Sequence, residues 1–250
     1  MKKYIASEFC TSMRSLMRSW CYVREDFAVK FEELYETGFF DENGPAEHIW
    51  ETKSKFVLKV PVAENKFAVY KSYRRISKPA KFILRPSPCG FEAENYQLIK
   101  KCGIPVPELS AVGDVRRNFR LKTAFLVTEF AENFRDGRDF LSGGIRNGDK
   151  ELKDEFICGH LELLARCHDA GILHRGFTPA NLLYKLRSAP DEKGRQLELM
   201  WIDVASCRRR PMFLLNSMCL QDLEQLFSYF DFSQEEKQKF TAFYRSCRQR

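Results

Sequence analysis

The hydrophobic pattern changes near residue 130, and this change constrains the fold more than any other feature. Before it, short apolar or alternating runs are typical of strands, at 48–53, 56–62, 66–74, 109–114 and 120–130. After it, helical spacing dominates at 151–170, 216–230 and 233–249, around strands at 182–185 and 197–206. A helix is also predicted at 91–102, ended by Gly103 and Pro105. We therefore predict an α+β protein with a small β-rich N-terminal lobe and a larger, mainly helical C-terminal lobe.

The first 45 residues are predicted to form an amphipathic helical extension. Within 3–35, apolar side chains such as Met13 and Trp20 recur at three- and four-residue steps, with Arg14 on another face. Such a segment packs on the following domain, or lies on an anionic membrane surface through its basic face and Trp20. A Gly/Pro/Asn cluster ends it as a loop. The predicted domains are 1–45 (extension), 46–131 (N-terminal lobe) and 132–250 (C-terminal lobe).

The composition is that of a globular protein and excludes a disordered tail or a fibrous repeat. Of 250 residues, 44% are hydrophobic and 30% charged, and 41 basic against 34 acidic residues give a net charge of +7. This balance favours anionic partners such as phosphates, acidic glycolipids or membrane headgroups. No run approaches the roughly 20 apolar residues of a membrane span. The start, MKKYIASEFC, lacks the apolar stretch of a secretory signal, so we expect a cytoplasmic protein.

The nine cysteines are predicted to be reduced, mostly buried thiols. Their number is odd and no pair has CxxC spacing. His160, Cys167 and His168 invite comparison with a zinc site, but the two histidines are too far apart for one helical turn and no second ligand pair follows. A structural role is therefore expected for these three side chains.

Two charged residues of the N-terminal lobe are candidates for phosphate binding. Lys71 lies in the middle of a predicted strand, where an ammonium group costs free energy unless an anion neutralises it. Glu94, on the following helix, shares a face with Phe91 and Leu98, which turns its carboxylate toward the core. Glu92 is the competing partner, because it shares the other face with Tyr96 and Ile99.

A second polar cluster is expected in the C-terminal lobe. The segment from His174 to Asn181 is a polar turn between a helix and an apolar strand, and Asp203 directly follows the apolar run LMWI. An amide oxygen and a carboxylate at the ends of neighbouring strands are hard ligands that suit Mg²⁺. The order Lys, Glu, His…Asn, Asp matches the order of parts in protein kinases.

Several linked motifs resemble those of the lipopolysaccharide kinase family, protein-kinase-like enzymes that phosphorylate heptose or Kdo sugars. The resemblance covers most of 50–245 and rests on ENYQLIKKCGIPVPE (94–108), FLVTEF (125–130), LARCHDAGILHRGFTPANLLY (164–184), and MWIDVASCRRRP (200–211) followed by Gln221–Asp222–Leu223. These look like the helix-C segment, the adenine-binding strand and hinge, the catalytic loop, and the metal-binding Asp with the next helix. The resemblance implies ATP and Mg²⁺ as cofactors.

The resemblance also implies a role for each matching residue. Lys71 would contact the α- and β-phosphates, Glu94 would orient it, and backbone groups near Glu129 would bind adenine. Asn181 and Asp203 would hold Mg²⁺ and act in catalysis together with two further residues of the loop, His174 and Arg175. Arg175 and Arg208–Arg210 would add positive potential for an acidic sugar or phosphate, or else form a solvated basic face.

One departure from the family pattern bears on activity. The position two residues after His174 is normally Asp, the base that orients the acceptor hydroxyl, and here it is Gly176. A Gly-rich loop over the phosphates is also missing, and ETKSK (51–55) stands in its place. Losing a general base costs about 10²–10⁴-fold in rate.

The leading hypothesis is an ATP-dependent sugar kinase acting on a lipopolysaccharide core or lipid A–Kdo acceptor, in the cytoplasm or peripherally at the inner membrane face. A pseudokinase that binds nucleotide as a scaffold or regulator is the alternative, favoured by Gly176. A small-molecule kinase of the aminoglycoside or fructosamine type is a third. Nucleic acid is not an expected partner, because basic and aromatic residues do not interleave on one strand face.

Overall fold

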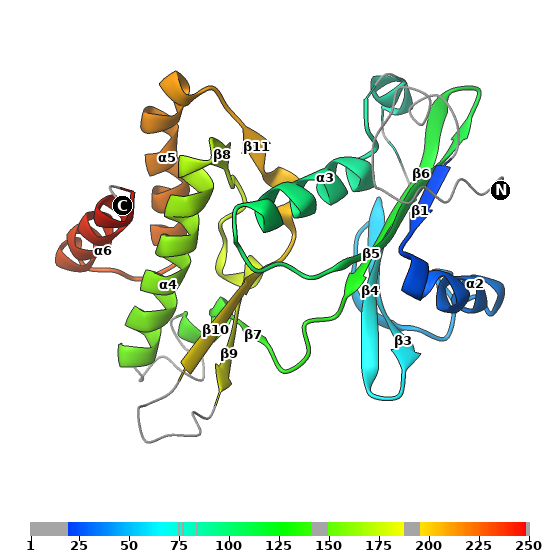
Figure 1. Cartoon of the computed structure of the whole chain (residues 1–250), viewed down its shortest axis with the longest axis horizontal. Coiled ribbons are helices and arrows are strands. Elements are labelled where there is room, and N and C mark those ends of the chain that lie inside the picture. Colours follow the sequence, from blue (N-terminus) through cyan, green and yellow to red (C-terminus); the bar gives the residue numbers. More distant parts are fainter. Residues whose placement is uncertain are drawn as a thin grey trace. The chain divides into compact units, whose positions relative to one another are not determined.

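A computed structural model describes residues 20–74, 76, 78–83, 85–141, 150–187 and 196–248. The chain divides into two compact units (Figure 1). Unit 1 contains an antiparallel sheet and draws on 1–94 and 107–132, whereas unit 2 is mainly helical and draws on 95–106 and 133–250. The order of a sheet followed by helices confirms the predicted α+β class.

Unit 1 is built on one six-stranded sheet in which every neighbouring pair is antiparallel. The strands lie in the order β1-β5-β6-β4-β3-β2. Their bounds are β1 (Trp20–Val23), β2 (Glu47–Glu51), β3 (Lys55–Ala63), β4 (Lys66–Tyr73), β5 (Leu109–Arg117) and β6 (Arg120–Glu129). The β-branched and aromatic residues of β3 alternate between buried and half-buried positions, as expected for a strand with a core on one face.

The hydrophobic core of unit 1 lies on one face of this sheet. The segment that precedes β2 packs against this face. Helix α2 (Ala28–Glu36) buries Phe31 and Leu34. Phe31 stacks on Phe125 of β6 at 5.7 Å between ring centroids, and Phe40 stacks on Tyr70 of β4 at 4.5 Å. These aromatic contacts make residues 20–46 part of the N-terminal unit and not a separate extension.

The prediction of helix at the N-terminus is wrong for Trp20–Val23, which form strand β1 against β5. Trp20 is only 9% exposed, so the proposed contact of this side chain with a membrane surface is also wrong. A four-residue strand is too short to show its own period, and Trp20 fell by coincidence at a helical step from earlier apolar residues. The predicted helix over 3–19 lies outside the described residues.

Helix α3 (Pro88–Lys101) begins three residues before the predicted start at 91. The Ser87 hydroxyl accepts a hydrogen bond from the Gly90 backbone N–H at 3.0 Å, and Pro88 takes the first helical position. Serine at the N-cap and proline just after it are favoured at helix starts, so the Ser-Pro pair was a readable signal. The first half of α3 belongs to unit 1 and the second half, from Asn95, to unit 2.

Among the described residues, unit 2 combines the second half of α3 and three further helices with two small antiparallel sheets. The further helices are α4 (Lys150–Asp169), α5 (Met212–Phe227) and α6 (Gln234–Cys247). Its strands are β7 (Arg135–Asp136), β9 (Leu182–Arg187) and β10 (Gln196–Trp201) in one sheet, and β8 (Ile172–Leu173) and β11 (Arg208–Arg209) in the other. The buried stripe of α4 includes Phe156 and Leu164, and α4 packs against α6.

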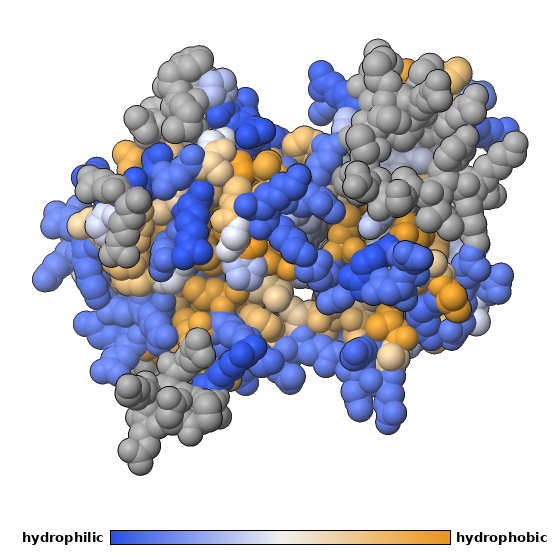
Figure 2. All heavy atoms as spheres, in the orientation of Figure 1, coloured by the Kyte–Doolittle hydropathy of each residue, from blue (hydrophilic) through white to orange (hydrophobic). Residues whose placement is uncertain are grey.

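The face of α6 that is seen in Figure 2 is mainly hydrophilic. Its buried residues are confined to one stripe that includes Phe240 and Tyr244. Among the helices that the structure describes, none has the length and apolar character needed to cross a membrane.

Candidate functional site

Lys71 lies in the middle of β4, directly across from Val57 on β3 and Leu126 on β6. Lys71 is only 8% exposed. Its Nζ donates hydrogen bonds to both carboxylate oxygens of Glu92, at 3.0 and 2.8 Å. Glu92 is itself 1% exposed. Each charge would be costly alone at this depth, so each group supplies the counter-charge of the other.

The phase of α3 determines that Glu92 contacts Lys71. Four fully or almost fully buried side chains share the face of Glu92 at steps of three and four residues: Cys89, Ala93, Tyr96 and Ile99. Glu94 and Leu98 are only half-buried. The orienting role expected for Glu94 is therefore corrected to Glu92, because Leu98 does not mark the face that packs into the core.

The segment after β6 carries the backbone groups expected to bind adenine. The Glu129 N–H donates to Glu108 O at 2.9 Å and the Phe130 N–H to Phe67 O at 3.0 Å. The Glu129 carboxylate accepts from both terminal nitrogens of Arg24, each at 3.1 Å. Glu129 thus positions this segment, while the Ala131 N–H donates to none of the described residues.

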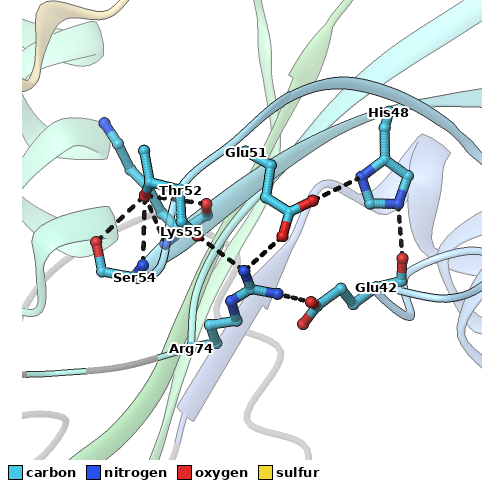
Figure 3. Close-up of polar contacts among 7 residues, drawn as sticks. All are labelled: Glu42, His48, Glu51, Thr52, Ser54, Lys55 and Arg74. Carbon is cyan, nitrogen blue, oxygen red and sulfur yellow. Dashed lines mark hydrogen bonds and ion pairs between the residues drawn. The ribbon is translucent and has the colours of Figure 1, made fainter.

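The turn between β2 and β3 contains residues 51–55, the segment expected where a Gly-rich loop would be (Figure 3). The Thr52 hydroxyl accepts from the backbone N–H groups of Ser54 and Lys55, at 3.3 and 3.2 Å. Arg74 braces the turn by donating to Thr52 O at 2.8 Å and to Glu51 at 2.7 Å, and it also pairs with Glu42. These N–H groups already have acceptors, so this turn is a rigid hairpin end and not an open phosphate cradle.

The loop after β8 is held by one buried carboxylate on α5. Asp222 accepts from the backbone N–H groups of His174 and Arg175, at 2.8 and 3.0 Å, and its Oδ2 lies 3.0 Å from Nε2 of His168. The other ring nitrogen of His168 lies 2.5 Å from the Tyr244 hydroxyl. Burial acts to raise the pKa of Asp222, but the hydrogen bonds from His168 and the loop outweigh it, so this pKa is held below its ordinary value.

The His174 side chain lies in the core and has no exposed surface. Its Nδ1 accepts from the Gly176 N–H at 3.2 Å, and its ring packs edge-on against Phe177 and Trp201. Burial lowers the pKa of His174 to about 4, so the ring is neutral at pH 7. The catalytic role expected for His174 is therefore corrected to a structural one, because a fully buried ring does not reach a substrate.

Ser206 occupies the space beside Gly176. A Cβ atom at position 176 would lie closer than 3.0 Å to the Ser206 hydroxyl oxygen, a separation that real Cβ atoms essentially never show. This hydroxyl donates to His174 O at 2.7 Å. Gly176 and Ser206 are both half-buried. The Ser206 side chain thus lies against the position where a side chain at 176 would begin.

Asn181 and Asp203, the expected Mg²⁺ ligands, flank the paired end of strands β9 and β10. Strand pairing of β9 with β10 ends beside them, and the Ile202 N–H donates to Asn181 O at 3.0 Å. The Asn181 amide donates through Nδ2 to Gly176 O at 3.0 Å, which leaves Oδ1 as its acceptor atom. This donor set fits Mg²⁺, whose remaining positions are commonly filled by water and phosphate oxygens. Among the described residues, no group of three or more His, Cys, Asp or Glu side chains is arranged to hold a metal ion.

Backbone conformation sets Arg175 and Asp203 apart. Both have left-handed φ values, 53° and 52°. Such a conformation is uncommon for residues other than glycine and asparagine, and it clusters at functional sites. Asp222 holds the backbone at Arg175, and the side chain of Arg175 is exposed.

The arginines after Asp203 form a positive surface with Arg175. Arg208 donates to Ala205 O at 2.8 Å and to Cys207 O at 2.6 Å. Its pKa is lowered, first by burial and also by the nearby charges of Arg175 and Arg210. Arg208 and Arg210 are half-buried, whereas Arg209 between them is exposed. Like charges held together in this way favour an anion between them.

The residues considered for zinc have structural roles. His160 accepts a hydrogen bond from the Trp201 indole N–H at 3.0 Å, and burial lowers its pKa to about 3. Cys167 is buried and its pKa is raised well above the ordinary value, mainly by burial. His168 lies between Tyr244 and Asp222. The eight cysteines among the described residues are all free thiols, and five of them are buried.

Comparison with known proteins places this chain in a family. The profile of the lipopolysaccharide kinase (Kdo/WaaP) family matches residues 66–244. No curated protein sequence matches the chain. A solved structure, "WaaP in complex with acyl carrier protein", is similar with a TM-score of 0.65 and 18% identity, over 90% of this chain and 88% of that one. A Rio2 kinase complex with ADP/Mg²⁺-phosphoaspartate from Chaetomium thermophilum has a TM-score of 0.51 and 15% identity, over 88% and 65% of the two chains.

These structural similarities confirm the predicted protein-kinase-like fold, and at such identities they show the fold alone. The family match includes Lys71, Glu92, the loop from His174 to Asn181 and Asp203. It extends over well more than half of the sequence. The chain therefore belongs to the lipopolysaccharide kinase (Kdo/WaaP) family.

Proposed function

We propose that this protein transfers the γ-phosphate of ATP to a sugar hydroxyl of a lipopolysaccharide core or lipid A–Kdo acceptor. The observation that carries the proposal is the buried Lys71–Glu92 pair within the family-matched region. Burying a charged lysine costs desolvation free energy. Binding a phosphate is a function that accounts for a lysine at this buried position. The family supplies the class of acceptor.

Each polar group of the site has a role in this reaction. Lys71 binds the α- and β-phosphates and Glu92 orients it. The backbone near Glu129, through the N–H of Ala131, binds adenine. Oδ1 of Asn181 and the carboxylate of Asp203 would hold Mg²⁺, which when bound neutralises charge on the phosphates.

The acceptor side of the site is assigned to the arginine surface. Arg175, Arg208 and Arg210 present positive charge, and an acidic sugar or a phosphate already carried by the acceptor would complement it. The acceptors are amphiphilic lipid precursors, so the proposed place of action is the cytoplasmic face of the inner membrane, with peripheral contact.

Nucleotide binding is the first test. Mg·ATP at 100 times its Kd is expected to stabilise the protein against unfolding by about 2.7 kcal/mol. Asp203→Ala and Lys71→Ala should each lose most of this stabilisation, whereas the exposed residues Asp231 and Lys66 provide matched alanine controls. Stabilisation that survives both site substitutions unchanged would refute the nucleotide site.

Transfer is the second test. Labelled γ-phosphate should appear on purified core oligosaccharide or lipid A–Kdo acceptor with the wild type and not with Lys71→Ala. An aminoglycoside and a fructosamine in the same panel distinguish a small-molecule kinase, which would label those acceptors in preference.

A nucleotide-binding protein without transferase activity is the second candidate. Gly176 favours it, since the position of the usual base has no side chain. Its signature is stabilisation by Mg·ATP that Asp203→Ala abolishes, together with no label on any acceptor of the panel.

A further inference from the structure

The space next to Gly176 holds the Ser206 hydroxyl, close to where the Cβ of any side chain at 176 would lie. Carboxylate oxygens lie about 2.4 Å from the Cβ of their own aspartate, as two bonds of ordinary length require. The Ser206 oxygen lies within 3.0 Å of the position that a Cβ of residue 176 would take. An oxygen of residue 206 therefore lies at the distance from this Cβ position that a carboxylate oxygen of residue 176 would have.

The hydrogen bonds of Ser206 determine how this oxygen can act. Its proton is donated to His174 O at 2.7 Å, so its lone pairs remain to accept a hydrogen bond. His174 is held in turn, because its backbone N–H donates to Asp222 at 2.8 Å. The acceptor atom is thus fixed in position by the same carboxylate that holds the loop.

Ser206 is also placed close to the candidate metal ligand. It ends the short helical turn Val204–Ser206 that follows Asp203, and the Cys207 N–H closes this turn on Val204 O at 3.1 Å. Ser206 is half-buried and so accessible to a ligand. One turn of chain therefore carries both the carboxylate of Asp203 and the hydroxyl of Ser206.

We propose that the Ser206 hydroxyl oxygen accepts a hydrogen bond from the acceptor hydroxyl and orients it for attack, in place of the missing carboxylate at position 176. This inference rests on the proposed transferase function. The acceptor oxygen forms a bond to the γ-phosphorus while the bond from that phosphorus to the β,γ-bridging oxygen breaks, and ADP leaves with the electron pair. The hydroxyl proton passes to an oxygen of the transferred phosphoryl group.

A serine is adequate for this role because of the character of the reaction. The transition state of phosphoryl transfer is loose, so little negative charge develops on the entering oxygen and orientation matters more than basicity. Ser206 supplies orientation without taking the proton. A side chain at 176 requires the Ser206 hydroxyl to move from its observed position, so restoring a carboxylate there is paired with removal of that hydroxyl.

The test is a coupled set of variants measured for label transfer to the core oligosaccharide or lipid A–Kdo acceptor and for stabilisation by Mg·ATP. Ser206→Ala is expected to lower kcat at least tenfold with unchanged Mg·ATP stabilisation, which also shows that the variant is folded. Gly176→Asp alone should be impaired by the clash. Gly176→Asp combined with Ser206→Ala should recover transfer to the wild-type rate or above, with a new acidic limb in the pH profile as the carboxylate titrates.

Ser228→Ala is the matched control, because this exposed hydroxyl also donates to a backbone carbonyl at 2.7 Å but lies on α5's C-terminal side, outside the site. The proposal is overturned if Ser206→Ala transfers as fast as the wild type, or if the double variant is no faster than Ser206→Ala. Wild-type protein that labels no acceptor overturns the proposed function and this inference together. Transfer by the wild type with no effect at Ser206 overturns the inference alone.

Discussion

At the scale of single residues, the burial of a charged side chain determines whether it needs an oppositely charged partner. Lys71 and Glu92 are both almost inaccessible to water and share two hydrogen bonds, so removal of either leaves an uncompensated buried charge. Half-buried Glu94, two residues away, keeps some contact with solvent.

Glu92→Gln is therefore expected to destabilise the protein by about 3–5 kcal/mol, the range for breaking a buried ion pair, and to abolish stabilisation by Mg·ATP. Glu94→Gln, its neighbour on the same helix, should change the free energy of unfolding by less than about 1 kcal/mol. Urea unfolding with and without Mg·ATP measures both quantities. Equal losses in the two variants would contradict the assignment of Glu92.

At the scale of elements, short segments are held by contacts that come from far along the chain. The loop from His174 to Asn181 depends on Asp222, which lies on α5, 48 residues after His174. Strand β1 has four residues and depends on its pairing with β5. Neither segment has enough local preference to adopt its conformation alone.

Helix α2 offers a direct test that the N-terminal segment belongs to the core of unit 1. Phe31 is 6% exposed and stacks against Phe125, so Phe31→Ala should cost about 3–5 kcal/mol of stability. Val29 on the same helix is 83% exposed, and Val29→Ala should change stability by no more than about 0.5 kcal/mol. Chemical denaturation of both variants is the measurement. Similar, small losses of stability in both variants would contradict the assignment of α2 to the core of unit 1.

At the scale of the whole molecule, buried neutral histidines couple stability to pH. The pKa values of His160 and His174 are lowered, mainly by burial, to about 3 and about 4, whereas an unfolded chain titrates its histidines near pH 6.5. Between these values the unfolded chain binds more protons than the folded protein. Stability is therefore complete above about pH 6.5 and is lost as the pH falls toward the folded pKa values.

We expect the free energy of unfolding to fall between pH 6.5 and about 4 by up to about 1.4 kcal/mol per pH unit for each of the two histidines. His160→Gln keeps an oxygen to accept the Trp201 N–H and removes one titrating group, so it should reduce this slope by about half. Urea unfolding at a series of pH values provides the slopes. A wild-type stability that is constant over this window would refute the buried neutral assignment.

Much of the fold was open to prediction because its elements are long enough to repeat their pattern. The 20-residue α4 shows its buried stripe over five turns, and β3 alternates between buried and half-buried positions along most of its length. The order of charged residues along the chain was enough to indicate a kinase-like fold, which the structural similarities confirm. The prediction failed at Trp20–Val23, because a strand of four residues is too short to display a hydrophobic period.

The candidate site, like the fold, could be predicted only in part from the sequence. Sequence by itself determined which residue types are available in which order: the strand lysine, the loop asparagine and the aspartate that follows an apolar strand. Tertiary structure alone decided that α3 turns Glu92 and not Glu94 toward Lys71, that His174 is buried, and that Ser206 fills the space at Gly176. The physical reason is that periodicity reports burial averaged over an element, whereas partner choice depends on the helix phase and on contacts between residues distant in sequence.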